Sequence, residues 1–469
     1  MENQLPKNWV EKELKEIIFY VIGGDWGKDP ESINDNDYKE VLCIRGSEIK
    51  NWTVNKGNTA SLRKIKKNSL ENRKLKFGDI LVEISGGGPD QPVGRTVFID
   101  EEVLKFESET PKVCTNFLRL LRMHENLNSE FINHYLQYFY NSGEITKYQG
   151  GSNNLRNLKF KEYETILIPL PPLSEQNRIV AKLDNLFVQL ETIKTSMVKI
   201  PVLLKNFRQQ VLTQAVTGKL TESWRVGKEL EEWKYEFAKD CCAKVQSGGT
   251  PKGSNFAMSG IPFLKVYNIV NNKIDFEYNP QYVSEEIQNS QIKKSITYPG
   301  DVIMNIVGPP LNKTAIIPNN YPEWNLNQAI TLFRVKKYLS NKFLYYFFCE
   351  GRSVKSLVNE TKGVVGQVNI SLSQCRDFSI PIPSEKEQQE IVSRIESLFT
   401  KADAIEKQYE TLKQKIDILP QAILHKAFKG ELVKQLDSDG DAKDLLKEIE
   451  ILKNNSIKSK NQKGSSYEN

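Results

Sequence analysis

The chain has 469 residues, of which 39% are hydrophobic and 26% are charged, a composition typical of a folded globular protein. This length predicts two to four domains, and no apolar run approaches the roughly 18 residues of a membrane span, which excludes a membrane protein. The formal net charge of +6 is compatible with a polyanionic partner without indicating one. The polar N-terminal stretch does not resemble a signal peptide, so we expect a cytoplasmic protein.

Cysteine and histidine, which are common ligands of transition metals, are few and scattered. The six cysteines include no CxxC pair, and none of the three histidines, His124, His134 and His425, stands at zinc-ligand spacing from them. We therefore expect free thiols and no metal site.

Residues 1–165 predict a domain that mixes strands and helices. The run GDILVEISGGGPD at 78–90 indicates a turn, a strand and a glycine-rich turn, and FINHYLQYFYNSGEI at 131–145 indicates a helix that ends at a glycine. A final strand is predicted at the end of NLKFKEYETILIPLP, which spans 157–171. This pattern is typical of an α+β domain of about 150 residues.

Polar side chains gather in the predicted turns of this domain. Arginine, asparagine and glutamine form paired hydrogen bonds with guanine or adenine edges, and lysine neutralises phosphate, so these turns are candidates for DNA contact. For each residue alone the alternative is ordinary solvated surface, and the runs LRKIKKN and GGSNNLRN are better candidates as groups. The candidate residues are Arg45, Arg63, Lys64, Lys66, Lys67, Gln91, Arg95, Asn153, Asn154 and Arg156.

Residues 166–225 predict long helices that follow a proline-rich strand end. Ser174 is the nearest residue able to cap the helix start, and Pro201 lies inside the apolar pattern, where it predicts a kink or a break. Apolar residues recur at alternating spacings of three and four, which is typical of a coiled-coil seam. An amphipathic helix lying on its own domain is the alternative. The seam comprises Leu183, Leu186, Leu190, Ile193, Met197 and Ile200.

The chain then repeats itself. ILIPLPPLSEQNRIVAKLDNLF at 166–187 aligns with FSIPIPSEKEQQEIVSRIESLF at 378–399, at a constant offset of 212 that preserves the two prolines and the Glu-Gln pair. Further upstream the offset drifts, so that GDVIMNIVGPP resembles the earlier Gly-Asp strand and Trp233 matches Trp9. The chain therefore consists of two tandem halves, each with a variable globular part and a constant helical part.

Residues 226–377 predict the second α+β domain and residues 378–435 the second helical segment, in which Pro420 again predicts a kink or a break. The polar turn residues of the second domain are Lys252, Lys265, Tyr267, Asn268, Asn312, Lys313, Lys362 and Gln367. The second seam comprises Ile395, Leu398, Ala402, Ile405, Tyr409 and Leu412. Two matched seams in one chain favour pairing with each other. Residues 436–469, polar and rich in lysine, predict a disordered tail.

Catalytic motifs are absent from the sequence. It contains no GxxxxGK[ST] loop and no GxGxxG helix start, and Gly308-Pro309-Pro310-Leu311 is not the loop that holds the target amine in amino-methyltransferases. Glu83 and Asp90 have no lysine at nuclease-like spacing, and few histidines are available as a general base. We expect no catalytic residues.

The tandem arrangement resembles the specificity subunit of type I restriction–modification systems. The resemblance covers residues 1 to about 435 and rests on IPLPPLSEQNRIVAKLDNLF, IPIPSEKEQQEIVSRIESLF, the helix ends QAVTGKL and KAFKGEL, and the two Gly-Asp strand starts. The second run departs from the usual Pro-Pro-Leu with Pro-Ser-Glu but keeps the Glu-Gln pair.

The resemblance implies two target-recognition domains that each read one part of a split double-stranded DNA site, separated by two long helices that form an antiparallel coiled coil with pseudo-twofold symmetry. It also implies that two methyltransferase subunits, which bind S-adenosylmethionine, dock on the helices, and that restriction subunits join them. This chain would then hold no cofactor itself. The alternatives are a non-catalytic coiled-coil scaffold that binds only proteins and a self-contained DNA-modifying enzyme.

Overall fold

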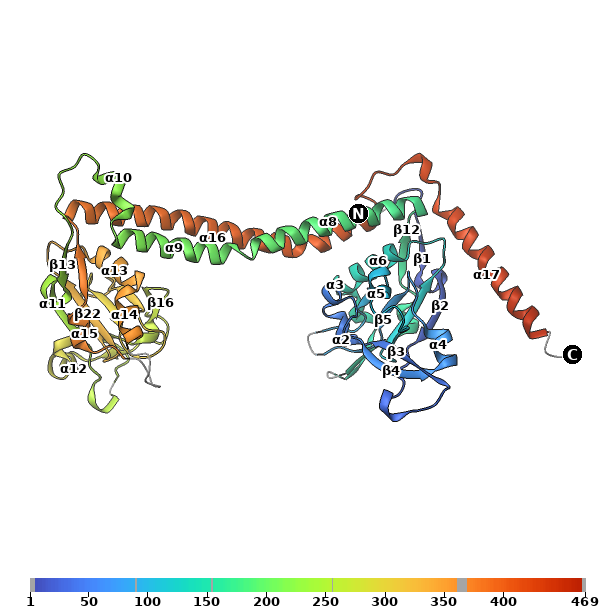
Figure 1. Ribbon diagram of the computed structural model, residues 1–469, viewed down its shortest axis with the longest axis horizontal. Coiled ribbons are helices and arrows are strands. Elements are labelled where there is room, and N and C mark those ends of the chain that lie inside the picture. Colours follow the sequence, from blue (N-terminus) through green and yellow to red (C-terminus); the bar gives the residue numbers. More distant parts are fainter. Residues whose placement is uncertain (1–4, 89–90, 153–154, 255, 361–368, 466–469) are drawn as a thin grey trace. The chain divides into compact units, whose positions relative to one another are not determined.

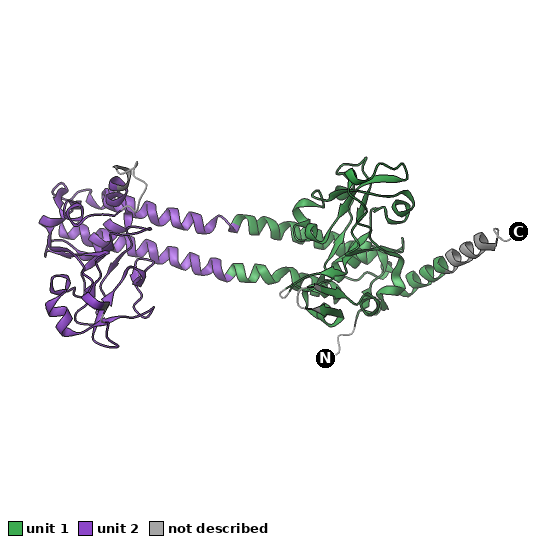
Figure 2. Cartoon of the chain, turned by 90° about the horizontal axis from the view of Figure 1, so that it is seen from below, with its two compact units in different colours: residues 1–196, 412–469 green, residues 197–411 purple. Residues whose placement is uncertain are grey.

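The computed structural model describes residues 5–88, 91–152, 155–254, 256–360 and 369–465 (Figure 1). The chain divides into two compact units: unit 1 comprises residues 1–196 and 412–469, and unit 2 comprises residues 197–411 (Figure 2). These units do not follow the predicted order of domains, because each contains one globular part together with a stretch of both helical segments.

The globular part of unit 1 is built on two main sheets. An antiparallel sheet has the order β2-β9-β5-β7, and a smaller sheet has the order β4-β3-β8, in which β3 and β8 are parallel. The first and last strands, β1 and β12, pair with each other, and β10, β11 and β6 form a third sheet. The strands are β1 Val10–Glu13, β2 Ile18–Gly23, β3 Tyr38–Ile44, β4 Ser61–Lys66, β5 Ile80–Glu83, β6 Ser85–Gly86, β7 Thr96–Phe98, β8 Lys112–Cys114, β9 Leu118–Met123, β10 Gln149–Ser152, β11 Leu155–Leu158 and β12 Leu167–Leu170.

Two helices of unit 1 matter most here: α6, in the globular part, and α8, in the helical segment. The N-terminus of α6 is capped by Asn128, whose side chain accepts a hydrogen bond from the Phe131 amide at 3.0 Å. The helices of this unit are α1 Leu14–Ile17, α2 Gly46–Ile49, α3 Trp52–Asn55, α4 Lys67–Arg73, α5 Glu101–Lys105, α6 Ser129–Asn141, α7 Phe160–Tyr163, α8 Leu173–Met197 and α17 Ala442–Ser465, with residues 412–428 of α16 (Glu385–Phe428).

Unit 2 repeats the two main sheets and the pairing of first and last strands, while its remaining described strands, β16 and β17, pair with each other. Its four-stranded antiparallel sheet has the order β14-β22-β19-β20, its parallel pair is β15 with β21, and its first and last strands, β13 and β23, pair with each other. The strands are β13 Lys234–Phe237, β14 Cys242–Ser247, β15 Ile261–Leu264, β16 Ile269–Val270, β17 Lys273–Ile274, β18 Tyr282–Val283, β19 Val302–Asn305, β20 Thr314–Ile316, β21 Asn325–Leu326, β22 Ile330–Val335 and β23 Ser379–Ile382. The helices are α9 Ile200–Val216, α10 Glu222–Arg225, α11 Ala238–Cys241, α12 Glu285–Ser290, α13 Asn341–Glu350, α14 Arg352–Glu360, α15 Leu372–Arg376 and the first part of α16.

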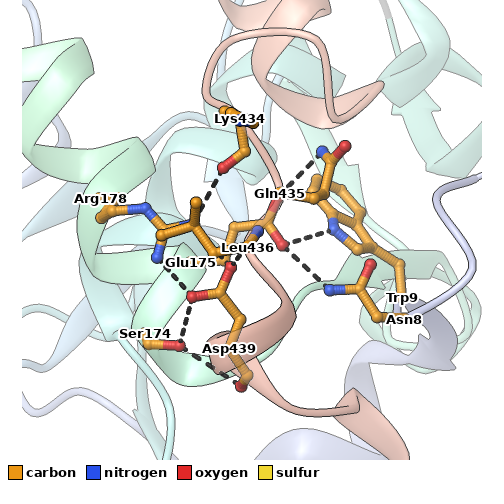
Figure 3. A network of polar contacts seen from close by, with 9 residues as sticks. All are labelled: Asn8, Trp9, Ser174, Glu175, Arg178, Lys434, Gln435, Leu436 and Asp439. Atoms are coloured by element: carbon orange, nitrogen blue, oxygen red, sulfur yellow. Dashed lines mark hydrogen bonds and ion pairs between the residues drawn. The ribbon is translucent and has the colours of Figure 1, made fainter.

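The repeated Glu-Gln pair anchors the start of a long helix in each unit. Buried Glu175 accepts hydrogen bonds from Trp9 Nε1 and Gln435 Nε2, each at 3.1 Å (Figure 3). Its equivalent in unit 2, Glu387, accepts from Trp233 Nε1 at 3.0 Å and from the Arg225 guanidinium at 2.6 Å. The expected match of the two tryptophans is therefore confirmed, and the motif is structural.

The neighbouring glutamine orients the N-terminus of a globular helix. Gln176 Oε1 accepts from the Asn128 amide at 3.0 Å, and its Nε2 donates to the Pro171 carbonyl at 2.8 Å. In unit 2 Gln388 makes the same two bonds, with the Ser340 amide at 2.7 Å and the Pro383 carbonyl at 2.9 Å. Because an unpaired buried amide is costly, these residues fix how each long helix joins its globular part.

The helical segments pack as antiparallel pairs inside each unit. In unit 2, Arg208 of α9 bridges Asp403 at 2.6 Å and Glu406 at 2.8 Å, while Arg394, nearer the start of α16, donates to the Leu220 carbonyl at 2.9 Å. In unit 1 the end of α16 contributes to the same apolar core as α8.

The predicted seam is wrong at three positions. Leu183, Leu190, Met197, Ile395 and Ala402 are buried, and Leu186, Ile200, Leu398 and Tyr409 are partly buried. By contrast, Ile193, Ile405 and Leu412 are 45–48% exposed. The predicted seam also assumed one continuous helix in the first half, but α8 ends at Met197 and α9 begins at Ile200.

The two prolines differ from each other in their effect. Pro201 occupies the first turn of α9, so the break predicted near it is confirmed. Pro420 lies inside α16, which continues to Phe428, so no break occurs there. Within residues 436–469, for which a disordered tail was expected, residues 442–465 form α17, and its Leu445 and Ile449 are buried in the core of unit 1. Residues 466–469 fall outside the described residues.

Candidate nucleic-acid interface

A cavity of about 730 Å³ lies in unit 1 beyond the ends of β3, β5 and β8. Three of the polar residues predicted from the sequence, Arg45, Gln91 and Arg95, line it together. Because sequence separates these residues by up to fifty positions, it is the sheet topology that brings them to one place. The full lining is Trp26, Arg45, Gly46, Ser47, Lys50, Glu83, Ser85, Gly86, Gly87, Gln91, Arg95, Thr115, Asn116 and Phe117.

Arg95 is held in a fixed orientation on one side of this cavity. Its Nε and Nη2 donate to the two carboxylate oxygens of Glu83 at 2.9 Å and 2.6 Å, and the Glu83 side chain is only 2% exposed. The hydrogen bond with Glu83 raises the pKa of Arg95 further above its usual value. With its amide oxygen turned toward the guanidinium, Gln91 accepts from Arg95 Nη2 at 3.1 Å. A charged, preorganised donor plane next to an amide suits recognition of a base edge.

Arg45 stands at the end of β3, where the chain turns into α2. Its Nη2 donates to Glu48 Oε1 at 2.6 Å, and its backbone amide donates to Glu48 Oε2 at 2.6 Å. The hydrogen bond with buried Glu48 raises the pKa of Arg45, so its guanidinium stays charged while 40% of the side chain remains exposed.

The other predicted residues of unit 1 that the structure describes do not line this cavity. Arg63 stacks 4.3 Å above the Trp26 ring and pairs with Asp29, and Lys64 Nζ donates to two carbonyls of the 30–33 stretch, so both hold a loop in place. Lys66 and Lys67 are exposed, and Arg156 is partly buried on β11. Asn153 and Asn154 fall outside the described residues.

Unit 2 places cations at the positions equivalent to Arg45 and Arg95. Lys265 follows β15, the strand equivalent to β3, and its amide donates to Asn268 Oδ1 at 3.0 Å, as the Arg45 amide does to Glu48. Lys313 pairs its carbonyl with the Asn305 amide at 3.0 Å, just as Arg95 does with Glu83. Arginine with glutamate in unit 1 is thus replaced by lysine with asparagine in unit 2.

The remaining residues predicted for unit 2 differ in their exposure. Asn268 is 1% exposed, with its Nδ2 bonded to the carbonyls of Asp275 and Tyr278. Asn312 Nδ2 donates to the Phe348 carbonyl at 2.7 Å, and Tyr267 Oη donates to that of Asn279 at 3.3 Å. Lys252 is exposed. Lys362 and Gln367 fall outside the described residues.

Sequence reasoning missed the loop between β8 and β9, which supplies Thr115, Asn116 and Phe117 to the cavity. Phe117 is 51% exposed, and an exposed ring beside cations is suited to contact with DNA. A close backbone approach shapes this loop: a Cβ on Gly24 would lie 2.1 Å from the Thr115 carbonyl oxygen, and in unit 2 one on Gly248 would lie 2.1 Å from that of Asn327. The Gly-Gly pairs at 23–24 and 248–249, one in each half of the sequence, were the signal that could have located this loop.

Comparison with known proteins decides the family. The family described as the type I restriction modification DNA specificity domain matches twice, over residues 6–201 and 230–414. The chain belongs to this family. Specificity subunits are the non-catalytic DNA-recognition components of type I restriction systems, so this protein is no methyltransferase or nuclease in its own right.

Relatives of this specificity subunit match along most of its length. It is 29% identical over 443 residues to the EcoKI specificity subunit of Escherichia coli strain K12, covering 92% of this chain and 91% of the relative. The EcoBI specificity subunit of Escherichia coli is 32% identical over 307 residues, which cover 61% of this chain and 62% of the relative. The HsdS subunit from Thermoanaerobacter tengcongensis has the same fold, with a TM-score of 0.62 at 20% identity, covering 92% of this chain and 98% of that structure.

Among the helices that the structure describes, none combines the length and apolar character needed to cross a membrane.

Proposed function

We propose that this specificity subunit reads double-stranded DNA in two parts, one at the cavity of unit 1 and one at the equivalent position of unit 2. This proposal is supported by basic side chains that recur at equivalent positions in the two units. They are Arg45 and Arg95 in unit 1 and Lys265 and Lys313 in unit 2. Arginine pairs with guanine through two hydrogen bonds, and lysine donates to guanine or to phosphate. Because the residue types differ between the units, the two half-sites differ in sequence.

The paired helices are the proposed docking surface for two methyltransferase subunits. Large apolar side chains are exposed along them: Val188, Val198, Val202 and Leu203 are 59–72% exposed, and Ile418 is 68% exposed. An apolar stripe left open on a helix is typical of a protein interface. The methyltransferase subunits would bind S-adenosylmethionine and carry the chemistry, and restriction subunits would join the same complex.

Substitutions in the two units test the proposed readers separately. In the complex with its methyltransferase, Gln91→Ala should relax the bases accepted in one half-site only, and Lys313→Ala those of the other half-site only. Loss of one paired base contact costs about 1–3 kcal/mol of discrimination. Mapping of methylated sites by sequencing measures this outcome. Lys443→Ala, on an exposed position of α17, is the matched control.

A scaffold that binds only proteins predicts a different result. Neither Gln91→Ala nor Lys313→Ala would then change the methylated sequence, and a change in both half-sites from one substitution would equally contradict two separate readers.

The docking surface is tested by a charge at an exposed apolar position. Val202 and Leu203 are 59% and 62% exposed, so the double variant Val202→Asp/Leu203→Asp should fold normally and lose methyltransferase binding in size-exclusion chromatography. Gln210→Asp, at an exposed position of the same helix, should assemble as the unmodified chain does. Full assembly of the double variant would place the docking surface elsewhere.

A further inference from the structure

Three potential metal ligands of unit 1 meet between two helices. Glu130 and His134 lie one turn apart on the same face of α6, and Asp184 faces them from α8. One ligand atom from each residue lies within 4.8 Å of the other two. Glu130 and His134 also line a cavity of about 490 Å³, so an ion has a route to them.

The state of His134 is an independent sign of a ligand. The side chain is only 9% exposed, and neither ring nitrogen has a hydrogen-bond partner. A buried polar atom without a partner costs about 1–3 kcal/mol. A metal ion bound at one ring nitrogen would supply the missing partner.

The acidic side chains around this imidazole outnumber the basic ones. Burial and the nearby charges of Asp184 and Asp100 raise the pKa of Glu130, and burial raises that of Asp184. The nearby cation Lys56 forms an ion pair with Asp100. That lysine is thus already paired, and neither Glu130 nor Asp184 forms an ion pair with it.

In unit 2 a lysine side chain occupies the position equivalent to Glu130. Asn128 and Ser340 cap equivalent helices and donate to equivalent glutamines, and they are 212 residues apart. Glu130, His134 and Asp184 therefore correspond to Lys342, Tyr346 and Glu396. Lys342 Nζ donates to Glu396 at 2.7 Å.

The surrounding geometry is also preserved between the two units. The Tyr346 ring lies 6.0 Å from that of Phe399, and the His134 ring lies 5.9 Å from that of Phe187, the residue equivalent to Phe399. In unit 1, Glu130 stands in place of the lysine that neutralises this position, and the His134 imidazole stands in place of the tyrosine ring.

We propose that Glu130, His134 and Asp184 bind one divalent transition-metal ion, with Zn²⁺ as the preferred ion, which joins α6 to α8. Histidine nitrogen and carboxylate oxygen are both zinc ligands, with metal–ligand distances of about 2.0–2.2 Å, and three protein ligands leave a position open on the ion. Ligand atoms around such an ion lie about 3.4 Å apart, so rotation of the two carboxylate side chains closes the site. Mg²⁺ and Ca²⁺ prefer all-oxygen ligands and suit it less well.

The experiment uses the full chain, treated with a chelator and kept reduced with a phosphine so that its cysteines stay as thiols. Isothermal titration calorimetry with ZnCl₂ should show one high-affinity site per chain. Thermal unfolding in the presence of ZnCl₂ should show a higher unfolding temperature than in its absence. MgCl₂ at the same concentrations should leave the unfolding temperature unchanged. Asp184→Asn, at an exposed position, should weaken zinc affinity at least tenfold.

A second variant separates zinc binding from folding. Glu130→Lys/His134→Tyr gives unit 1 the residues that unit 2 already uses, so it should fold without zinc and lose the zinc-dependent rise in unfolding temperature. Glu396→Gln in unit 2 is the matched control and should retain that rise. Undiminished zinc binding by the double variant, or no zinc binding by the unmodified chain, would overturn the proposal. Neither result depends on DNA recognition.

Discussion

Asp79 and Asp301, the aspartates of the two repeated Gly-Asp pairs, make the same contacts in both units. Each forms a two-pronged ion pair with an arginine on the neighbouring strand, Arg122 at 2.7 Å and Arg334 at 2.7–2.9 Å. Each also accepts a hydrogen bond from the backbone amide of the residue three positions earlier. A buried carboxylate with this many donors fixes the strand start, so the motif specifies fold rather than DNA contact.

Removing one of these aspartates should destabilise its unit strongly. Asp79 is fully buried, so Asp79→Ala leaves the Arg122 guanidinium without its partner, and we expect a loss of about 3–5 kcal/mol in the free energy of unfolding. Asp29→Ala removes the partner of Arg63, but Asp29 is 60% exposed, so it should cost no more than about 1 kcal/mol. Chemical denaturation of the two variants measures the difference, and equal losses would contradict it.

Residue type alone predicts only part of the candidate interface. Arg45, Gln91 and Arg95 were predicted from their chemistry, and the structure brings them to one cavity. Asn268 has the same chemistry, but its amide closes a buried turn, because asparagine serves turns and base edges with the same atoms. The sequence could not separate these uses without the backbone.

The cluster of Glu130, His134 and Asp184 shows a second limit of residue-scale reasoning. Cysteine and histidine spacing gave no sign of the proposed metal site, because two of its three proposed ligands, Glu130 and Asp184, are carboxylates, and Asp184 lies fifty residues after His134. Only the packing of α6 against α8 brings them together. Comparison of the aligned repeats was the available signal, since it sets glutamate against lysine at this position.

At the scale of elements, periodicity predicted the helices well and their ends less well. The apolar spacing located α8, α9 and α16, but it treated the interrupted α8 and α9 as one seam. In the tail, Ala442, Leu445 and Ile449 follow helical spacing and are buried, yet the surrounding lysines and asparagines masked that pattern. Local composition is outweighed when a few spaced apolar residues find a core to pack against.

Two neighbouring seam positions should respond differently to a charge. Leu190 is 3% exposed, and Leu190→Asp buries a carboxylate without a partner, so we expect a cost of several kcal/mol and loss of methyltransferase assembly. Ile193, one turn away, is 45% exposed, and Ile193→Asp should leave the unfolding temperature nearly unchanged. Thermal unfolding of both variants tests the corrected seam. Similar losses of unfolding temperature in the two variants would show that Ile193 belongs to the buried seam, as the strict heptad pattern predicts.

At the scale of the whole chain, equivalent residues of the repeat occupy the apolar cores of the two units. In unit 1, Ile179, Val180 and Leu183 share a core with Leu424, Ala427 and Phe428 from the end of α16. In unit 2 the equivalent residues, Ile391, Val392 and Ile395, share a core with Leu212, Ala215 and Val216 from the end of α9. Each helix end therefore completes a core that begins with the opposite half of the sequence. The tandem halves and the pairing of the two seams were predicted from the sequence, but the sharing of each globular core with the helix end of the opposite half was not, because the repeat does not say where each helix end packs.

A fragment of residues 1–225 tests this exchange. It lacks Leu424, Ala427 and Phe428, so the core of unit 1 is left open, and the residues that match them, Leu212, Ala215 and Val216, lie on its own α9. A second copy can supply them reciprocally, so the fragment should form a dimer, less stable than the chain because Val216 is smaller than Phe428 and α17 has no substitute.

Analytical ultracentrifugation of this fragment should show the dimer, and Leu212→Asp should abolish it. With the methyltransferase present, two identical readers should direct methylation to a palindromic split sequence that contains the first half-site twice. The palindrome follows because a twofold contact presents the same cavity, with Arg45 and Arg95, to both arms of the DNA. A folded monomer, or methylation of the original asymmetric site, would show that the two helix ends are not interchangeable.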